Sequence, residues 1–343
     1  MRLTTISISI LIIVVIVALL FDLVNGFHDA ANSIATIVST GVLKPKTAVL
    51  WAAGFNFVAM LFFAPRVAET ISKIVIIESS DFSYVYVVLI GLLSAIIWDL
   101  LTWWFGLPTS SSHALIGGFM GAGIANAGWH AIRWEMLFDT FIFIVAAPIM
   151  GFICAFFLML LLYWLLRKWH PARVNQLFGK AQFVSAAMYS LGHGANDAQK
   201  TMGIIMALFI GTGVFSSSTS LSLFNPQTSW IIISCHAAMA LGTALGGWNI
   251  VKTMGMKITK LKPIGGFCAE TAGAFTLFLV SYVGIPVSTT HTITGAIVGV
   301  GSISHKISSV KWGIAARIVW AWVFTIPVTA SLALGIFYLC AKL

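Results

Sequence analysis

The stretches Asn-Gly-Phe-His-Asp-Ala-Ala-Asn-Ser, at residues 25–33, and Gly-His-Gly-Ala-Asn-Asp-Ala-Gln-Lys-Thr, at residues 192–201, are polar interruptions of two long apolar segments. Those segments run from about residue 6 to 40 and from about 180 to 212, longer than the roughly 20 residues that cross a bilayer. Both stretches contain glycine, which permits a helix to open and free its backbone carbonyls. The pattern predicts two membrane helices that are broken at their polar motifs.

The composition of the chain also places it in a membrane. Hydrophobic residues make up 59% of the 343 residues and charged residues 8%, against about 25% charged residues in soluble domains. The net charge of +9 comes mainly from lysines and arginines in short loops, which favours a positive-inside bias over nucleic-acid binding. The 4 cysteines lie singly in apolar stretches, so neither disulfides nor a zinc site is expected.

Apolar segments along the whole chain predict an all-α, polytopic membrane protein. Their approximate ranges are 6–40, 45–63, 84–105, 108–127, 136–166, 180–212, 229–251, 265–283, 286–303 and 312–340. The most basic connectors, 167–180 and 252–262, are expected on the cytoplasmic side of the cytoplasmic membrane. If successive segments alternate in direction, both termini then lie outside.

The sequence repeats itself. Gly-Leu-Pro-Thr-Ser-Ser-Ser-His at 106–113 matches Gly-Ile-Pro-Val-Ser-Thr-Thr-His at 284–291, and Gly-Phe-His-Asp-Ala at 26–30 matches Gly-Ala-Asn-Asp-Ala at 194–198. Each copy holds about five segments, an odd number, so the second copy is expected upside down, as in many secondary transporters. The predicted organisation is a first inverted repeat at 1–166, a cytoplasmic linker at 167–180 and a second inverted repeat at 181–343.

Each polar motif carries an aspartate at membrane depth, Asp29 in the first copy and Asp197 in the second. An ionisable group there costs at least about 2.5 kcal/mol on insertion scales, which favours a functional role over a merely structural hydrogen bond. Hard cations prefer carboxylate, amide and carbonyl oxygens, and Asn25 and Asn32 accompany the first aspartate. The sequence predicts that Asn25, Asp29, Asn32 and Asp197 bind a coupling cation.

The two proline motifs each begin an apolar helix, with proline suited to the first turn. A helix start offers unpaired N–H groups and a positive dipole, and hydroxyl side chains add further donors without net charge. Two such re-entrant-type starts meeting near the membrane midplane would bind an anion, whereas ordinary capping by serine and threonine is the alternative. The candidate residues are Thr109, Ser110, Ser111, Ser112, Ser288, Thr289 and Thr290.

Histidines and one glutamate add candidates for proton transfer or orientation. His28 and His193 lie in the polar motifs and are either proton carriers or hydrogen-bond donors. His113 and His291 occupy equivalent repeat positions and are expected to orient the hydroxyl loops. Glu270 lies among apolar residues, where it either pairs with a lysine or takes a proton.

Together these motifs resemble the inorganic phosphate transporter (PiT) family, in its compact bacterial low-affinity form. Both repeats of that family carry a Gly-Ala-Asn-Asp type signature, matched here by residues 26–32 and 194–200. The paired Pro-x-Ser-x-x-His motifs match as well. The short central loop at 167–180 is similar to that of the compact bacterial members, and the likeness spans almost the entire chain.

The resemblance implies a symporter that moves inorganic phosphate across the cytoplasmic membrane with a proton, a sodium ion or as a metal–phosphate complex. Asp29, Asn32 and Asp197 would bind cation and phosphate, and the hydroxyls around Ser110 and Ser288 would cradle the anion. The expected partners are phosphate, the cation, the lipid bilayer and a second copy of the chain in a homodimer. No cofactor is expected, and no metal site is firmly assigned.

One position departs from the family pattern. Where the first copy has Asn32, the second has Lys200, three residues after its aspartate. An ammonium here could replace one mobile cation or contact the anion directly, so Lys200 is placed with Asn196 among the candidate phosphate-binding residues. The hypothesis is that Lys200 reduces the number of co-transported cations and favours proton or metal–phosphate coupling.

Other functions are weighed against this one. The nearest alternative is transport of another tetrahedral oxyanion such as sulfate, although phosphate can donate hydrogen bonds to Asp29 and Asp197 and sulfate cannot. An intramembrane enzyme is not expected, because the sequence has no HExxH or Gly-x-Ser-x-Gly motif and its polar groups come in duplicate. A channel is the third possibility, which saturable, gradient-driven accumulation would exclude.

Overall fold

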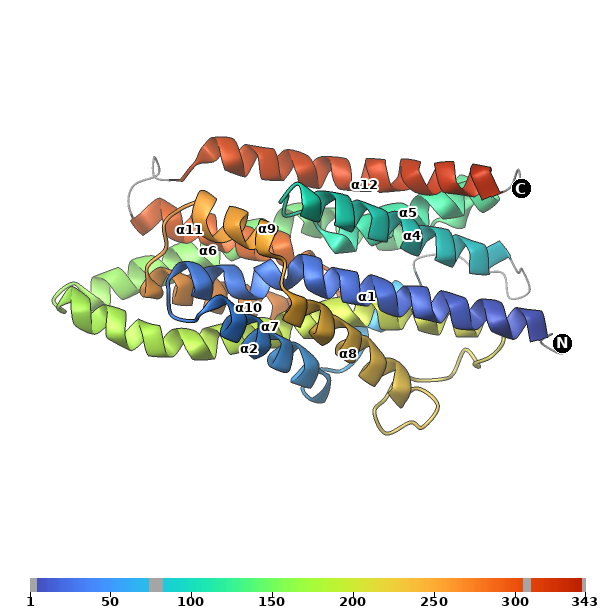
Figure 1. Ribbon diagram of the computed structural model, residues 1–343, viewed down its shortest axis with the longest axis horizontal. Helices are drawn as coiled ribbons and strands as arrows, with labels where there is room; N and C mark the ends of the chain where they lie inside the picture. The colour runs from blue at the N-terminus through green and yellow to red at the C-terminus, as the bar shows by residue number, and fades with distance from the viewer. Residues whose placement is uncertain (1–4, 74–82, 305–309, 341–343) are drawn as a thin grey trace.

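The computed structural model describes residues 5–73, 83–304 and 310–340, and every regular element in these ranges is a helix (Figure 1). In chain order the elements are α1 (Thr5–Ser39), α2 (Pro45–Val58), η1 (Ala59–Leu61), α3 (Arg66–Ile71), α4 (Ser83–Trp104), α5 (Ser111–Ala127), η2 (Trp129–Ala131), α6 (Trp134–Leu166), α7 (Pro171–Gly211), α8 (Ser229–Leu245), α9 (Trp248–Lys252), η3 (Thr253–Lys257), α10 (Pro263–Val283), α11 (Thr289–Ser304) and α12 (Trp312–Cys340).

Five helices in the described ranges are long and apolar enough to cross a membrane. They are Ile8–Ser39, Tyr84–Trp104, Thr140–Leu166, Pro263–Val283 and Trp312–Cys340. The bent pair formed by α8 with α9 and η3 qualifies as a sixth when it is taken as one span. These lengths confirm the prediction of an all-α, polytopic membrane protein.

Local sequence explains where several helices begin and end. Proline occupies the first turn of α2, α7 and α10, where its missing N–H would have no helical partner in any case. Gly284 ends α10 in the left-handed conformation, at φ 85°, which a residue with a Cβ rarely adopts. The chain can therefore turn sharply from α10 toward the second proline motif.

The predicted breaks in the first and sixth segments are wrong. Both α1 and α7 run as continuous helices through their polar motifs. The glycines serve close packing instead: a Cβ on Gly26 would come within 2.2 Å of the Met239 carbonyl oxygen on α8, and one on Gly194 within 2.5 Å of the Asn56 carbonyl oxygen on α2. Helix backbones approach this closely only where a side chain is missing.

A break does occur elsewhere, in the segment predicted at 229–251. α8 and the following α9–η3 helix are bent by 60°. Gly246 lies at the bend with φ 75°, and a Cβ on Gly247 would come within 2.6 Å of the Phe27 carbonyl oxygen on α1. The bend therefore lies directly beside the polar motif of α1.

The helix starts at the two proline motifs lie inside the bundle, where they touch each other. Ser112 Oγ donates to the Val287 carbonyl oxygen at 3.3 Å, and Trp322 Nε1 donates to the Pro108 carbonyl oxygen at 2.9 Å. Figure 1 shows α4 and α5 in the half of the molecule that holds both chain ends, and α10 and α11 in the other half. Each helix pair reaches from one end into the middle, as re-entrant-type helix starts require.

Packing contacts come in pairs related by exchange of the two halves of the chain. α1 packs on α8 as α7 packs on α2, and α5 packs on α12 as α11 packs on α6. A Cβ on Gly121 of α5 would come within 2.2 Å of the Ala330 carbonyl oxygen on α12, and one on Gly299 of α11 within 2.5 Å of the Phe152 carbonyl oxygen on α6. α1 and α7 run in opposite directions in Figure 1, as an inverted repeat would require.

The connection between the halves is shorter than the predicted linker. Only residues 167–170 lie between α6 and α7, because Pro171 already begins α7 and the His170 side chain caps it by accepting from the Ala172 N–H. Most of the residues assigned to the linker at 167–180 are therefore helical. The repeat boundaries at 1–166 and 181–343 stay a prediction.

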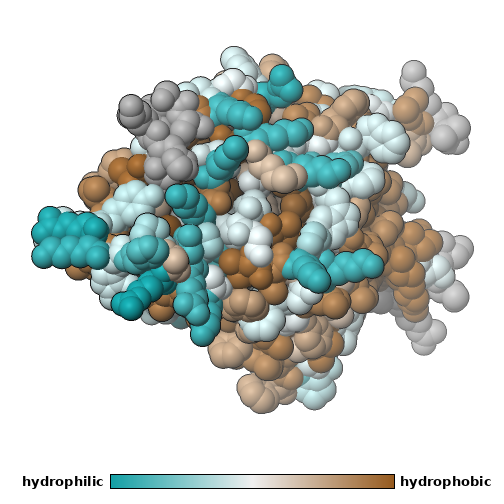
Figure 2. All heavy atoms as spheres, turned by 60° about the vertical axis from the view of Figure 1, so that its left-hand side comes forward, coloured by the Kyte–Doolittle hydropathy of each residue, from teal (hydrophilic) through white to brown (hydrophobic). Residues whose placement is uncertain are grey.

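Hydrophilic side chains gather at the end of the molecule where α6 turns into α7 (Figures 1 and 2). The exposed basic residues near the predicted cytoplasmic connectors are Lys44, Lys46, Arg167, Lys168, Arg173, Lys180, Lys252, Lys257, Lys260 and Lys262. The start of α1 and the end of α12 lie together at the opposite end. The molecule thus has one basic end and one end that holds both chain ends.

Candidate functional site

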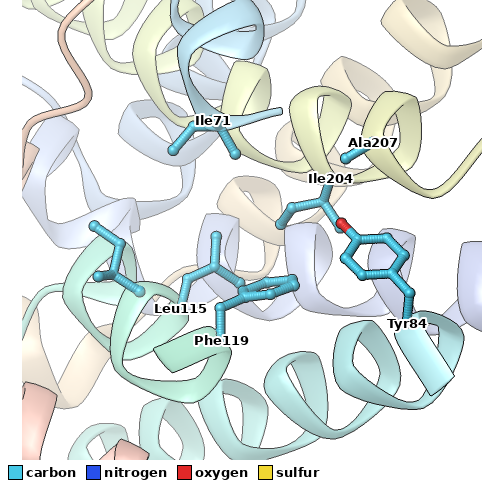
Figure 3. A pocket seen from close by; sticks show the side chains of 7 residues that line it. Ile71, Tyr84, Leu115, Phe119, Ile204 and Ala207 are labelled. Atoms are coloured by element: carbon cyan, nitrogen blue, oxygen red, sulfur yellow. The ribbon is translucent and has the colours of Figure 1, made fainter. Parts of the chain in front are cut away.

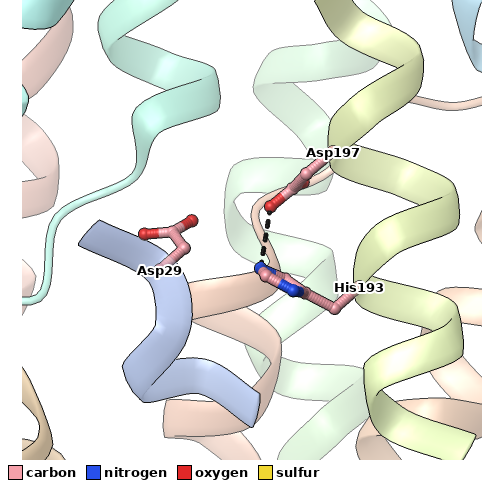
Figure 4. A group of neighbouring side chains, drawn as sticks. All are labelled: Asp29, His193 and Asp197. Atoms are coloured by element: carbon pink, nitrogen blue, oxygen red, sulfur yellow. Dashed lines mark ion pairs between the residues drawn. The ribbon is translucent and has the colours of Figure 1, made fainter. Parts of the chain in front are cut away.

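Asp29 on α1 and Asp197 on α7 come together in the core of the bundle (Figure 4). With His193 they offer ligand atoms that all lie within 4.8 Å of one another, and none of the three residues is more than 3% exposed. Two carboxylates and an imidazole at this spacing could hold a cation. The structure therefore brings the two predicted aspartates together, and the identity of what they bind stays a prediction.

Asp197 is held from three directions. Its Oδ2 accepts from Thr289 Oγ1 at 3.0 Å and lies 3.2 Å from His193 Nε2, the ion pair drawn in Figure 4. Its Oδ1 accepts from the Lys200 ammonium. Because Thr289 begins α11, this carboxylate ties the polar motif of α7 to one of the two helix starts.

Lys200 lies at the centre of this network and is 2% exposed. Its Nζ donates to Asp197 Oδ1, to Ser112 Oγ and to the Val287 carbonyl oxygen, the last at 2.9 Å. Ser112 belongs to the first proline motif and Val287 to the second, so one ammonium joins both helix starts to α7. A buried charge requires such partners, because leaving it unpaired costs about 3–5 kcal/mol.

Asn32 makes the corresponding contacts from α1. Its Nδ2 donates to Thr289 Oγ1 at 3.1 Å and to Thr290 Oγ1 at 2.9 Å. Thr290 is the residue that matches Ser112 in the repeated proline motif. Asn32 and Lys200 therefore occupy matching positions, and each reaches the helix start of the opposite half.

Asp29 is paired with its neighbour His28. His28 Nδ1 lies 2.7 Å from Asp29 Oδ1, and His28 Nε2 lies 3.1 Å from Thr102 Oγ1. Thr109 Oγ1 donates to Thr102 Oγ1 at 2.9 Å. Thr109 therefore belongs to the Asp29 side of the site, and no lysine pairs with Asp29 among the described residues.

Two of the predicted phosphate-cradling serines cap their own helices. Ser110 Oγ accepts from the His113 N–H at 3.3 Å, and Ser288 Oγ accepts from the His291 N–H at 3.2 Å. For this pair the structure supports the capping alternative. The hydroxyls of Ser112, Thr289 and Thr290, which follow the caps, contact Lys200, Asp197 and Asn32, and Ser111 is buried beside them.

The two matching histidines lie against each other in the proline-motif helices. The rings of His113 and His291 meet edge to face, with centroids 4.6 Å apart, and His291 stacks on Trp322 at 3.8 Å. This packing fixes the two helix starts relative to each other. It is compatible with the orienting role expected of this pair, which stays a prediction.

Three further candidates lie outside the cluster around Asp29 and Asp197. Glu270 accepts from Thr36 Oγ1 at 2.6 Å, from Gln182 Nε2 at 2.9 Å and from Ser185 Oγ at 2.5 Å, and it has no lysine partner within the described part of the chain. Asn196 turns its amide toward Ser281 Oγ at 3.2 Å instead of toward the helix starts. Asn25 is buried on α1, and its Oδ1 makes no hydrogen bond to the described residues.

Two site residues were missed by the sequence reasoning. Tyr189 OH donates to the Thr289 carbonyl oxygen at 3.0 Å, and its ring stacks on His193 with centroids 6.5 Å apart. Thr102 joins His28 to Thr109. Tyr189 precedes His193 by four residues, which puts both on one helix face, and this spacing could have identified it.

An apolar pocket lies between α3, α4, α5 and α7 (Figure 3). It is lined by Ile71, Tyr84, Leu115, Ile116, Phe119, Ile204 and Ala207. Leu115 follows Ser112 by three residues and Ile204 follows Lys200 by four, so each lies one turn farther along its helix, toward the end that holds both chain ends. Apart from the Tyr84 hydroxyl this lining is apolar, so the pocket does not resemble an anion site.

Comparisons with known proteins agree on one family. A model described as the phosphate transporter family matches residues 25–333. The chain is 52% identical over 339 residues to a protein of Rhizobium meliloti (strain 1021), described as a probable low-affinity inorganic phosphate transporter, with 99% of this chain and 98% of that protein covered. A Bacillus subtilis (strain 168) protein with the same description is 42% identical over 321 residues, and the match covers 94% of each.

The fold has a counterpart among solved structures. A structure titled the sodium-dependent phosphate transporter superimposes with a TM-score of 0.85 at 24% identity, covering 98% of this chain and 100% of that chain. At this identity the likeness concerns the fold alone. It extends over the whole helical arrangement described above.

Proposed function

The chain belongs to the phosphate transporter family, and from this premise we propose that it carries inorganic phosphate across the cytoplasmic membrane together with a cation. Its relatives are described as transporters, so the expectation that it is not an enzyme is confirmed. Transport of phosphate is what the two curated relatives are named for. Coupling to a cation is argued below from the site itself.

The observation that carries the proposal is the meeting of Asp29, His193 and Asp197 beside two helix starts. The helix starts and their hydroxyls suit an anion, while the two carboxylates repel one. Asp197 is already paired with the Lys200 ammonium, so binding of an anion here would be favoured by a mobile cation beside Asp29. Each ligand therefore strengthens binding of the other, which is the thermodynamic basis of coupling.

The membrane potential also favours transport of phosphate together with a cation. Moving one negative charge inward against 100 mV costs about 2.3 kcal/mol, and phosphate near neutral pH carries between one and two such charges. Uptake into a negative interior thus requires co-transported positive charge. The site would supply it through a cation held by Asp29 and Asp197, with phosphate at the backbone N–H groups and hydroxyls of the two helix starts.

Orientation and assembly follow from the same picture. We propose that the basic end faces the cytoplasm, which places both termini outside. Residues 1–166 and 181–343 would act as two inverted repeats that rock around the site between them. Two copies would form a homodimer, as the family resemblance implies.

The decisive experiment is uptake of labelled phosphate into proteoliposomes with sodium, proton and magnesium gradients imposed one at a time. We expect accumulation against the phosphate gradient with at least one of the three cations, and saturation with increasing phosphate. Absence of accumulation under every gradient would contradict symport. Equilibration without accumulation would instead indicate a channel.

Competition distinguishes phosphate from the other oxyanions. Phosphate donates hydrogen bonds to carboxylates and sulfate does not, so excess sulfate should leave phosphate uptake unchanged. Arsenate, which has the same protons, should compete. Strong competition by sulfate would favour the broader oxyanion function.

A further inference from the structure

We propose that the Lys200 ammonium is a tethered cation, which permanently fills a position that a mobile coupling cation would otherwise occupy. The protein would therefore move each phosphate with one cation fewer than the same site would need without this lysine. The inference rests on the proposed symport and specifies its stoichiometry. It concerns one side chain that breaks the symmetry between the two halves.

The surroundings of Lys200 Nζ are those of a bound cation. A carboxylate oxygen of Asp197, the hydroxyl oxygen of Ser112 and the carbonyl oxygen of Val287 surround it, each from a different segment of the chain. Carboxylate, hydroxyl and carbonyl oxygens are also the ligand set that hard metal cations prefer. The ammonium therefore takes the place of such an ion in its own oxygen shell.

The position on α1 that matches Lys200 is Asn32, whose side chain carries no charge. Asn32 donates to Thr290 Oγ1 as Lys200 donates to Ser112 Oγ, and these two hydroxyls match in the repeated motif. An amide is neutral, and the partner of Asp29 is the His28 imidazole, so Asp29 has no lysine ammonium comparable to that of Asp197. The Asp29 side is left as the place for a mobile cation.

The charges of the site agree with a fixed cation at Asp197 and a mobile cation at Asp29. Counted with neutral His28 and His193, the two carboxylates and one ammonium give a net charge of −1, which one monovalent cation neutralises before phosphate is added. Replacing Lys200 by a neutral residue gives −2 and calls for a second cation. The geometry also argues against Lys200 as a direct phosphate ligand, because an ammonium has three N–H donors and three protein oxygens already accept from it.

The test compares wild type with Lys200→Asn, which restores the residue found at the matching position 32. The control is Lys168→Asn, the same change at an exposed lysine between α6 and α7. Proteoliposomes are held at zero membrane potential with equal pH and a tenfold inward sodium gradient, and labelled phosphate is followed to its final accumulation ratio. A second series uses a tenfold proton gradient.

At zero potential each coupled cation contributes one factor of ten to the accumulation ratio, because a tenfold gradient is a tenfold term in the equilibrium constant. We expect the product of the accumulation ratios from the two series to be about tenfold higher for Lys200→Asn than for wild type and Lys168→Asn. An active Lys200→Asn protein with the wild-type ratio would overturn the proposal. If wild type accumulates no phosphate under a sodium, a proton or a magnesium gradient, the proposed function fails instead.

An inactive Lys200→Asn protein is resolved by a binding measurement on Lys200→Ala, which empties the oxygen shell. Phosphate binding to purified Lys200→Ala is titrated against sodium or methylammonium at constant ionic strength, with choline as the replacement ion. We expect a dependence on cation concentration steeper by one power than in wild type. An unchanged slope, or loss of folded protein in both neutral variants even at high salt, would show a purely structural lysine and overturn the proposal.

Discussion

Asp197 and Asp29 occupy matching positions, but they differ in their partners. Asp197 is paired with the buried ammonium of Lys200, whereas Asp29 is paired with the imidazole of His28. Removing one member of a buried ion pair leaves the other as an unpaired charge in a medium that solvates it poorly. The two aspartates should therefore respond differently to the same substitution.

We expect Asp197→Asn to lower the free energy of unfolding by about 3–5 kcal/mol, because it leaves the Lys200 ammonium unpaired. Asp29→Asn should lower it by much less, since no lysine loses its partner. Both should reduce phosphate uptake by roughly 100-fold, the upper range of ordinary coupling energies. Thermal unfolding of the purified proteins and initial uptake rates in proteoliposomes measure the two effects.

The double variant Asp197→Asn with Lys200→Asn is the internal check on this difference. It removes both charges together and should regain most of the stability lost in Asp197→Asn. Glu135→Gln, at an exposed carboxylate on α6, serves as the control and should change neither quantity. Equal stability losses for Asp29→Asn and Asp197→Asn would contradict the assigned pairing.

At the scale of helices, glycines set how closely the bundle packs. A Cβ on Gly295 of α11 would come within 2.1 Å of the Pro148 carbonyl oxygen on α6, and one on Gly117 of α5 within 2.7 Å of the Ile326 carbonyl oxygen on α12. Without a hydrophobic driving force between helices in lipid, this close contact supplies much of the association energy. The helices that carry the two proline motifs are held in place by it.

Gly295→Ala should therefore destabilise the protein, by about 1–3 kcal/mol, because the added methyl group forces α11 away from α6. Gly335→Ala on α12 is the matched control, since a Cβ there meets no atom within 4 Å. The midpoint of thermal unfolding in detergent measures both. A Gly295→Ala protein as stable as the control would show that the contact is not needed.

The structure also explains which parts of the helices could be predicted from the sequence. The starts of α5 and α11 were predicted from local signals, but about three residues too early. Both prolines precede the capping serines, Ser110 and Ser288, and do not occupy the first turn. The continuity of α1 could not be predicted from the sequence. Gly26 is needed for close packing against Met239 of α8, and a local sequence pattern contains no information on such a tertiary contact. A polar motif in an apolar helix can be satisfied by opening the helix or by contacts to other helices, and here the second occurs.

The contacts of individual side chains could likewise be predicted only where the sequence carries a long-range signal. The convergence of Asp29 and Asp197 followed from their matching places in the repeat, which is a long-range signal written in the sequence. The partners of Glu270, by contrast, come from α1 and α7 at positions without any shared pattern. Sequence alone therefore left open whether that carboxylate paired with a lysine or with neutral donors.

At the scale of the whole molecule, charge separates two ends. The connection between α6 and α7 lies at the basic end, and the loop between α7 and α8, residues 212–228, contains no charged residue. Lysine and arginine are retained on the cytoplasmic side of membranes. The two connections should therefore face opposite compartments.

Single cysteines introduced into a variant without the four native ones would test this orientation. We expect Lys168→Cys to react with a membrane-impermeant maleimide only after the cytoplasmic face is opened. Ser217→Cys, exposed in the loop between α7 and α8, should react in intact cells. The reverse labelling pattern would mean that the basic end lies outside.

The central claim is that phosphate and a cation bind together where the two aspartates meet the two helix starts. Equilibrium binding of labelled phosphate to the purified protein, with and without the cation that drives uptake, tests it most directly. We predict that replacing that cation by choline weakens phosphate binding at least about tenfold, and that Asp29→Asn removes this dependence. Equal phosphate affinity with and without the cation would contradict the account.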